Sequence, residues 1–253
     1  MRRLIAALAF SFAIAACSGA DDASAQADRV DVRDRAEIEA VVRAYILENP
    51  EIIEEALIEL QMRARQRERQ ALAQAVASQA ERVYEDPRDP VLGAADAPIT
   101  VVEFFDYRCP YCTLTNDWVQ SVLEDHGDQV RFVFKEYPVN GETSTEAARA
   151  ALAVWRLQPD LYAAFHDGMM TASGPLPSER INEIAADLGV DVAAMRAEMD
   201  AEEITAHLVD TRALARSIGR VGTPFFVIDG KAVNGADLNA LDRLLGEALQ
   251  QAG

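Results

Sequence analysis

The sequence predicts an α/β protein in which a long helical block interrupts a β-sheet. Apolar runs of strand length alternate with segments of helical periodicity, and this order is typical of α/β folds. Strands are expected at 99–105, 129–135, 225–228 and 231–233, and helices outside the block at 109–125 and 238–249. The block covers about residues 144–218 and breaks into apolar helical segments at 147–157, 161–170, 178–188, 191–199 and 202–218.

The size and charge of the chain limit the domains that it can form and the partners that it can bind. The chain has 253 residues, half of them hydrophobic, which is enough to bury one domain of about 150 residues and a smaller part. The net charge is −18, and the only lysines are Lys135 and Lys231. Because phosphate binding needs a basic face, nucleic acid is not expected as a partner.

The first residues predict export. Residues 1–16 combine two arginines with an apolar stretch too short to cross a bilayer, as in a signal peptide. Residues 14–17 resemble a bacterial lipobox, in which Cys17 would be lipidated, and an unpaired third cysteine in an exported chain favours this interpretation. The alternative is ordinary cleavage after Ala25. In both cases the expected location is the periplasm or the cell envelope, with a lipid anchor favoured.

A helical segment is expected between a tether and the main domain. Residues 17–34 are small, acidic and aperiodic, and predict a flexible tether. Residues 35–85 predict two helices, one up to Glu48 and one from Asn49-Pro50 to about Tyr84. The second helix carries apolar residues at coiled-coil spacing: Ile53, Leu57, Leu60 and Ala64.

This pair of helices has an apolar face but no core of its own. The face must pack either against the main domain or against other copies of the chain. The seam spacing favours self-association, so residues 35–85 are interpreted as an oligomerisation segment. Two prolines among charges in 86–90 mark the boundary to a domain at 90–250.

Two cysteines, Cys109 and Cys112, stand where the strand 99–105 gives way to a helix. Unpaired backbone N–H groups and the positive end of the helix dipole meet at such a helix start. Both favour the thiolate, which is the nucleophilic form of cysteine. The two-residue gap brings the second sulfur within bonding reach of the first, as a reversible disulfide requires.

Other roles for the cysteine pair are weaker. Zinc needs four ligands, but the third cysteine is Cys17, and the three histidines, His126, His166 and His207, are far apart in sequence. Thr113 after Cys112 excludes the haem-attachment pattern. A purely structural disulfide between Cys109 and Cys112 would close a very small ring and would add little to the stability of the fold. The sequence therefore favours a redox-active pair, with no metal and no cofactor.

A second motif precedes the strand 225–228. Residues 221–224 read Val-Gly-Thr-Pro, and a proline before a buried strand offers no N–H and marks a tight turn. The spacing alone cannot establish whether the Thr223–Pro224 bond is cis.

Together these features resemble the thioredoxin-like, DsbA-type disulfide oxidoreductases over about residues 90–250. The matching features are the strand–Cys109-Pro110-Tyr111-Cys112–helix unit, the helical insertion and the turn 221–224. Residues 35–65 also resemble the N-terminal helical segment of suppressor-of-copper-sensitivity C and Com1-type proteins. The resemblance implies a thioredoxin-like fold with an inserted helical domain, preceded by an N-terminal helical segment.

The resemblance also implies roles for the cysteines and their surroundings. Cys109 would be the exposed attacking thiol and Cys112 the buried resolving thiol, and the two would form the redox disulfide. Pro224 would be cis and place the Thr223 backbone where it can pair with an extended substrate. Pro110 and Tyr111 would contact that substrate.

Three further residues are less clearly assigned. Glu103 matches a buried acid of the family that assists proton transfer near the resolving cysteine, and the alternative is a solvated carboxylate without a role. His126 and His166 match no catalytic position and are interpreted as surface or packing residues.

The expected reaction is thiol–disulfide exchange on exported proteins with cysteines. In the family, threonine before the cis proline is commoner in reducing and isomerising members, which favours an isomerase or reductase over an oxidase. A Cu(I)-handling protein is an alternative, because paired thiolates bind Cu(I). Expected partners are client proteins, a membrane redox partner that recycles the site, and further copies of the chain, with a trimer as the expected oligomer.

Overall fold

The computed structural model describes residues 32–219 and 221–252. The signal peptide predicted at 1–16, Cys17 and the tether up to residue 31 lie outside these residues. The chain forms two compact units, 1–63 and 64–253. None of the described helices is both long and apolar enough to cross a membrane.

In the first unit the two predicted helices are present. They are α1 (Val32–Glu48) and the first part of α2 (Glu51–Ala77), which continues into the second unit. The Asn49 side chain donates from Nδ2 to the Tyr45 carbonyl at 2.8 Å, so it satisfies the end of α1. Most of the large apolar side chains in α1 and in α2 up to Met62 are exposed in the single chain, among them Val41, Tyr45, Leu57 and Leu60.

The second helix is shorter than the sequence predicts. α2 ends at Ala77, and a separate short helix, α3, covers Ala80–Tyr84. The Ser78 hydroxyl donates to the Ala75 carbonyl at 2.7 Å, and the Gln79 N–H donates to the Val76 carbonyl at 3.0 Å. These bonds tighten the last turn and end the helix.

The second unit is built on a five-stranded sheet in the order β1-β3-β2-β4-β5. The strands are β1 (Val91–Leu92), β2 (Ile99–Phe105), β3 (Val130–Glu136), β4 (Phe225–Ile228) and β5 (Lys231–Asn234). β2 and β3 are parallel, and the other neighbours are antiparallel. The strands predicted from apolar runs are confirmed, whereas β1 was not predicted, because two residues are too short to give a strand pattern.

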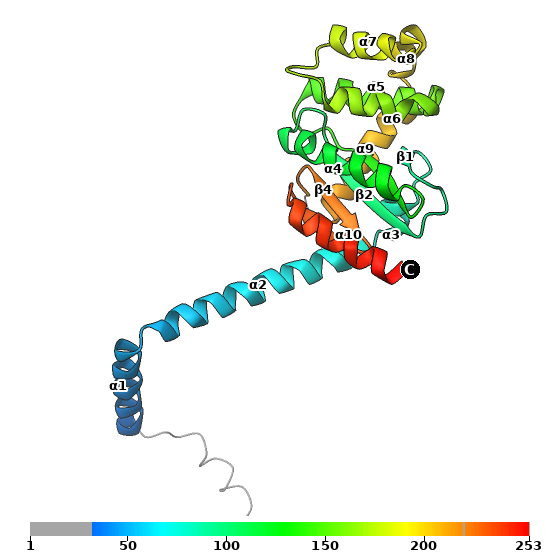
Figure 1. The fold of residues 1–253 in the computed structure, drawn as a ribbon. Coiled ribbons are helices and arrows are strands. Elements are labelled where there is room, and N and C mark those ends of the chain that lie inside the picture. The colour runs from blue at the N-terminus through cyan, green and yellow to red at the C-terminus, as the bar shows by residue number, and fades with distance from the viewer. Residues whose placement is uncertain (1–31, 220, 253) are drawn as a thin grey trace, which may run out of the picture. The chain divides into compact units, whose positions relative to one another are not determined.

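The helices of this unit follow the predicted order. They are α4 (Pro110–His126), α5 (Glu142–Leu157), α6 (Pro159–Met170), α7 (Ser178–Asp187), α8 (Val192–Glu198), α9 (Glu202–Ser217) and α10 (Leu238–Ala252). α5 begins at Glu142, earlier than the expected Ala147, because its first turn is polar and gives no apolar signal. Figure 1 shows α10 beside the strands and the block α5–α8 at the opposite end of the unit.

Alternate residues of the strands point into two separate cores. One face packs against α4, α10 and the helical block, and its strand residues include Val101, Phe105, Phe132, Phe134 and Phe226. The other face packs against the end of α2, α3 and α9, and its strand residues include Val102, Phe104, Val133, Phe225 and Val227. Both central strands are therefore covered on both sides, which explains their continuous apolar runs.

We predict that Gly93→Ala destabilises the protein by about 1–3 kcal/mol, because Gly93 has a positive φ that an alanine adopts only with strain. An added Cβ would also lie 2.3 Å from the Val130 carbonyl oxygen, at the start of β3. Urea unfolding measures the change. The control is Gly246→Ala in α10, where an added Cβ meets nothing within 4 Å and stability should rise by about 0.5–1 kcal/mol. Equal midpoints for Gly93→Ala and the wild type would contradict the prediction.

Candidate active site

The two cysteines lie at the start of α4, directly after β2. Cys109 is the N-cap residue, with an extended backbone (φ −86°, ψ 115°), and Pro110 opens the helix. A proline fits this position because its fixed φ is helical and its missing N–H would have no partner in the helix. The Cys109 carbonyl accepts the Cys112 N–H at 3.0 Å and the Thr113 N–H at 3.2 Å. The first turn is thus formed, with Cys109 at its free N–H end.

The second motif completes the site from the far end of the sequence. The Thr223–Pro224 peptide bond is cis, as the resemblance implied. The Cys109 thiol donates to the Thr223 carbonyl oxygen at 3.2 Å. The fold therefore brings together the two motifs that the sequence singled out.

The exposure of these residues differs in part from the expectation. Cys112 is fully buried, whereas Cys109 is 6% exposed, so only an edge of the expected attacking thiol reaches solvent. Tyr111 is 63% exposed, and Thr223 is half-buried. Both thiols are free in this structure. Tyr111 and Thr223 are thus more exposed to solvent than Cys109 itself.

The surroundings push the pKa values of the two thiols in opposite directions. A hydrogen bond from the Cys112 thiol is the largest cause that lowers the pKa of Cys109 to about 5. Burial opposes this shift, whereas the Thr223 side chain and the N–H groups of Cys112 and Tyr111 add to it. Burial, followed by the nearby Cys109 and Glu103, raises the pKa of Cys112 far above its usual value. At neutral pH, Cys109 is therefore the thiolate and Cys112 the thiol.

Asp106, which the sequence analysis did not single out, holds the loop before Cys109. Its buried carboxylate accepts the Arg108 N–H at 2.7 Å and the Ser144 hydroxyl at 2.8 Å on one oxygen. The other oxygen accepts the N–H groups of Val139 at 2.7 Å and Asn140 at 2.9 Å. Asp106 could have been predicted from its position in the sequence, because it is an acidic residue between a buried strand and the cysteines.

Glu103 lies on β2, and it is 1% exposed, so the alternative of a solvated carboxylate is wrong. Burial is the main cause that raises the pKa of Glu103 to about 8, and the charge of Cys109 adds to it. An acid with a pKa near neutrality can take up and release a proton under the conditions of thiol exchange.

A second buried polar group lies on the same sheet face. The Tyr107 hydroxyl donates to Glu136 Oε1 at 3.2 Å and lies 3.0 Å from His166 Nδ1. Burial lowers the pKa of His166 to about 3, and burial raises the pKa of Glu136 well above its usual value. His166 also packs edge-on against Phe105, with ring centroids 5.0 Å apart. The packing role expected for His166 is confirmed.

The sequence analysis missed the role of Glu136 and Tyr107 in this group. Glu136 could have been found from the alternation of β3, where it follows Phe132 and Phe134 on the inward side. His126, by contrast, is the last residue of α4, at the opposite end of that helix from the cysteines.

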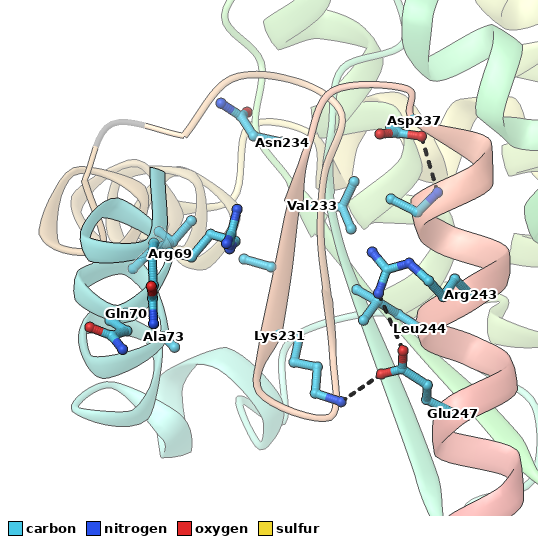
Figure 2. A pocket seen from close by; sticks show the side chains of 14 residues that line it. Arg69, Gln70, Ala73, Lys231, Val233, Asn234, Asp237, Arg243, Leu244 and Glu247 are labelled. Atoms are coloured by element: carbon cyan, nitrogen blue, oxygen red, sulfur yellow. Dashed lines mark hydrogen bonds and ion pairs between the residues drawn. The ribbon is translucent and has the colours of Figure 1, made fainter. Parts of the chain in front are cut away.

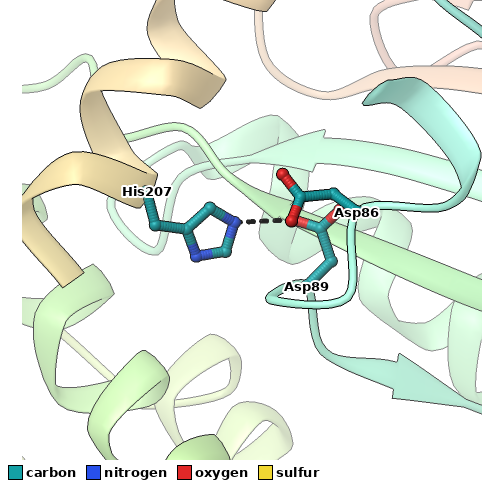
Figure 3. A group of neighbouring side chains, drawn as sticks. All are labelled: Asp86, Asp89 and His207. Atoms are coloured by element: carbon teal, nitrogen blue, oxygen red, sulfur yellow. Dashed lines mark hydrogen bonds and ion pairs between the residues drawn. The ribbon is translucent and has the colours of Figure 1, made fainter. Parts of the chain in front are cut away.

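A group of metal-binding residue types lies away from the cysteines. Figure 3 shows Asp86, Asp89 and His207, whose ligand-type atoms lie within 4.8 Å of one another. Asp89 is already bonded to His207 Nε2 at 2.8 Å and to the buried ammonium of Lys135. Asp86 accepts two bonds from the Arg88 guanidinium, at 2.9 and 2.7 Å. Because these carboxylates are held by cations of the chain, the group serves as an ion-pair network.

Comparison with known proteins agrees with this geometry. The model of the DSBA-like thioredoxin domain family matches residues 100–245, more than half of the chain. The site is that of a thiol–disulfide oxidoreductase, and the chain belongs to the DSBA-like thioredoxin domain family. The model of the copper resistance protein ScsC N-terminal domain matches residues 34–67.

Individual relatives support both matches. The crystal structure of Proteus mirabilis ScsC in a transitional conformation is 30% identical, with a TM-score of 0.65, and the match covers 88% of this chain and 100% of that one. A thioredoxin-like oxidoreductase from Silicibacter pomeroyi is 38% identical, with a TM-score of 0.62, over 67% of this chain and 97% of that one. The expected resemblance and fold are confirmed.

Curated relatives differ in length from this chain. Disulfide bond formation protein D of Bacillus subtilis is 29% identical over 64% of this chain and 77% of its own length. Several others are Na⁺/H⁺ antiporters. One of these, from Herminiimonas arsenicoxydans, is 30% identical over 61% of this chain, which spans only 25% of its length.

We predict that Cys112→Ala raises the pKa of Cys109 by about 1–2 units, because the variant loses the hydrogen bond to the thiolate. A hydrogen bond to a charged group contributes about 1.5–3 kcal/mol of stabilisation. The rate of Cys109 alkylation by iodoacetamide against pH measures the midpoint, which is about 5 in the wild type. Cys112→Ser keeps a hydroxyl donor and should give a smaller shift. An unchanged midpoint in Cys112→Ala would show that the neighbouring thiol does not stabilise the thiolate.

Proposed function

We propose that this protein is an exported thiol–disulfide oxidoreductase that reduces or isomerises disulfides in client proteins. The observation that carries the proposal is the contact of Cys109 with Thr223, which joins a thiol of lowered pKa to the turn before a cis proline. Family membership supports the oxidoreductase class. The isomerase or reductase role rests on the nature of residue 223 and on the oligomer proposed below.

The chemistry follows from the two pKa values. The Cys109 thiolate attacks one sulfur of a client disulfide, the client S–S bond breaks, and its other sulfur leaves as a thiolate that takes a proton from water. In reduction, the ionised form of Glu103, which is the minor form at neutral pH because its pKa is about 8, takes the proton of Cys112, and Cys112 attacks the Cys109 sulfur. The client is then released as a second thiolate, and Cys109 and Cys112 become the disulfide. In isomerisation, a client thiolate attacks the mixed disulfide instead and frees Cys109.

The substrate contacts are proposed from the rim of the site. The Thr223 backbone pairs with an extended client chain, while Pro110 and the exposed Tyr111 contact its side chains. An oxidase of DsbA type is the second candidate, because the lowered pKa of Cys109 also stabilises the reduced enzyme and would make the disulfide oxidising.

Copper handling is a weaker candidate. The family model that matches residues 34–67 is named for a copper resistance protein. This stretch, however, contains neither cysteine nor histidine to bind copper. Cu(I) would therefore be bound by the thiolates of Cys109 and Cys112, which are soft ligands. Titration of the reduced protein with Cu(I), followed by an exchange assay, separates the two activities.

We propose that the chain works in the periplasm or cell envelope, anchored by a lipid on Cys17. Ordinary cleavage after Ala25 would give a soluble form instead. The site then needs a membrane redox partner that returns it to the reduced state. A periplasmic thioredoxin-like protein from Salmonella enterica is among the similar solved structures, with 27% identity and a TM-score of 0.61.

We also propose that the segment 35–85 joins copies of the chain, as a trimer, through its exposed part in the first unit, because the end of α2 and α3 pack against the sheet of the second unit. In the first unit, large apolar residues of α1 and α2 are between 46% and 70% exposed, including Ile38, Val41, Ile53, Leu57 and Leu60. A face of this kind along two consecutive helices is unusual for a monomer. Several sites in one oligomer suit isomerisation, because one client can be bound by more than one subunit.

In a scrambled-ribonuclease assay, the reduced protein is expected to restore activity, and Cys109→Ser to abolish it, because the attacking thiolate is lost. Cys112→Ser should accumulate mixed disulfides that are visible on a non-reducing gel. Cys17→Ser is the control and should keep full activity.

The redox state of the pair in cells decides the direction. A pair that is mostly reduced supports the isomerase or reductase, whereas a mostly oxidised pair supports the oxidase. Full activity of Cys109→Ser would refute the role assignment itself.

Leu57→Asp combined with Leu60→Asp is expected to convert the oligomer to a monomer, because charge on the seam cannot be buried without a partner. Light scattering at micromolar concentration measures the mass. Glu55→Gln, on the same helix, is the control and should leave the mass unchanged. A monomeric wild-type protein would contradict the proposed oligomer.

A further inference from the structure

An open groove of about 650 Å³ lies beside the loop that follows β3. One wall is this loop, with Pro138 and Val139, and the other is α9, with Arg212 and Arg216. Val221, just before the turn with the cis proline, also lines it. The groove thus combines an apolar wall with two guanidinium groups.

Two residues that line the groove are linked to the surroundings of Cys109. Val221 is two residues from Thr223, whose carbonyl contacts the Cys109 sulfur. The Val139 N–H is held by Asp106, whose carboxylate also holds the Arg108 N–H next to Cys109. Two residues of an extended chain span about 7 Å. A client paired with the Thr223 backbone would therefore reach the groove about two residues from its own cysteine.

The charge of the groove is opposite to that of the chain. No acidic residue lines it, although acids outnumber lysine and arginine by 42 to 24 in the sequence. Arg212 donates from Nη2 to the Pro138 carbonyl at 3.1 Å. Within the described part of the chain, neither Arg212 nor Arg216 has an acidic group within salt-bridge distance.

Another groove of this unit shows the usual arrangement. Figure 2 shows Lys231 and Arg243 in a groove next to β5 and α10, where both are bonded to Glu247 at 2.9 and 3.2 Å. Asp237 lines the same groove. There Glu247 pairs with two of the three cationic side chains, and Arg69 is the third. In the groove beside the active site, neither arginine has an acidic partner among the described residues.

We propose that the groove formed by Arg212, Arg216, Val139 and Val221 binds an acidic side chain of the client, close to the client's cysteine. The inference rests on the proposed function and adds a substrate class to it. The guanidinium groups pair with the client's carboxylate, and the apolar wall packs against the carbon chain of its Glu or Asp. Clients with an acid near the reactive cysteine are then attacked faster than neutral ones.

The test uses short peptides that carry one cysteine linked to 2-thiopyridine, so that attack by Cys109 releases a neutral, coloured thione. One set has Glu two residues before or after the cysteine, and a matched set has Gln. For one of these positions, the Glu-to-Gln ratio of second-order rates should be about fivefold higher for the wild type than for Arg212→Gln combined with Arg216→Gln. A general effect of the net charge of −18 also enters this ratio, so a control variant that removes a positive charge elsewhere is needed.

Two controls make the result decisive. Arg180→Gln, on the surface of α7 and paired with Glu183, should keep the wild-type ratio. Arg216→Gln alone should lower the ratio part of the way, and it decides the case if the double variant does not fold. Equal ratios for the wild type and the arginine variants at both positions would overturn the inference. Absence of thione release from every peptide would instead overturn the proposed function.

Discussion

Four hydrogen bonds converge on the buried carboxylate of Asp106, and the geometry of the site depends on them. They join the end of β2, the loop after β3 and the start of α5, which are distant in sequence. The Asp106 carbonyl also accepts the Cys109 N–H at 2.9 Å, so the backbone of the same residue fixes the N-cap residue of α4. Bonds to a charged acceptor are the stronger kind. Asp106 therefore holds a wall of the neighbouring groove through its carboxylate and the nucleophile through its carbonyl.

The central sheet separates two sets of buried charges. Glu103 and Glu136 point to the face that carries α4, where no lysine or arginine is buried among the described residues, and both are held as acids of raised pKa. On the opposite face, Lys135 is buried with Asp89, which also binds His207. The strand β3 places Lys135 and Glu136 side by side in sequence but on different faces. The buried carboxyl groups of raised pKa therefore lie on the face that carries α4, while the paired ions connect α9 to the segment before β1.

Most of the fold could be predicted from the sequence, because its central strands are continuous apolar runs and its helices are periodic. The predictions failed where local polarity hid an element, as in the first turn of α5, or where a few hydrogen bonds ended one, as at Ser78. For the site, the cysteines, Thr223, Pro224 and Glu103 were found from motifs and resemblance. Asp106, Glu136 and Arg212 were not, because their roles depend on partners that are distant in sequence and that only the folded chain brings together.

The recessed position of Cys109 has a consequence for the choice of client. Only 6% of Cys109 is exposed to solvent. For the exchange with client proteins proposed above, a disulfide on a loose, flexible segment would reach such a buried residue more easily than one set into a convex, fully folded surface. The burial of Cys109 would then make the enzyme select incompletely folded clients over folded ones.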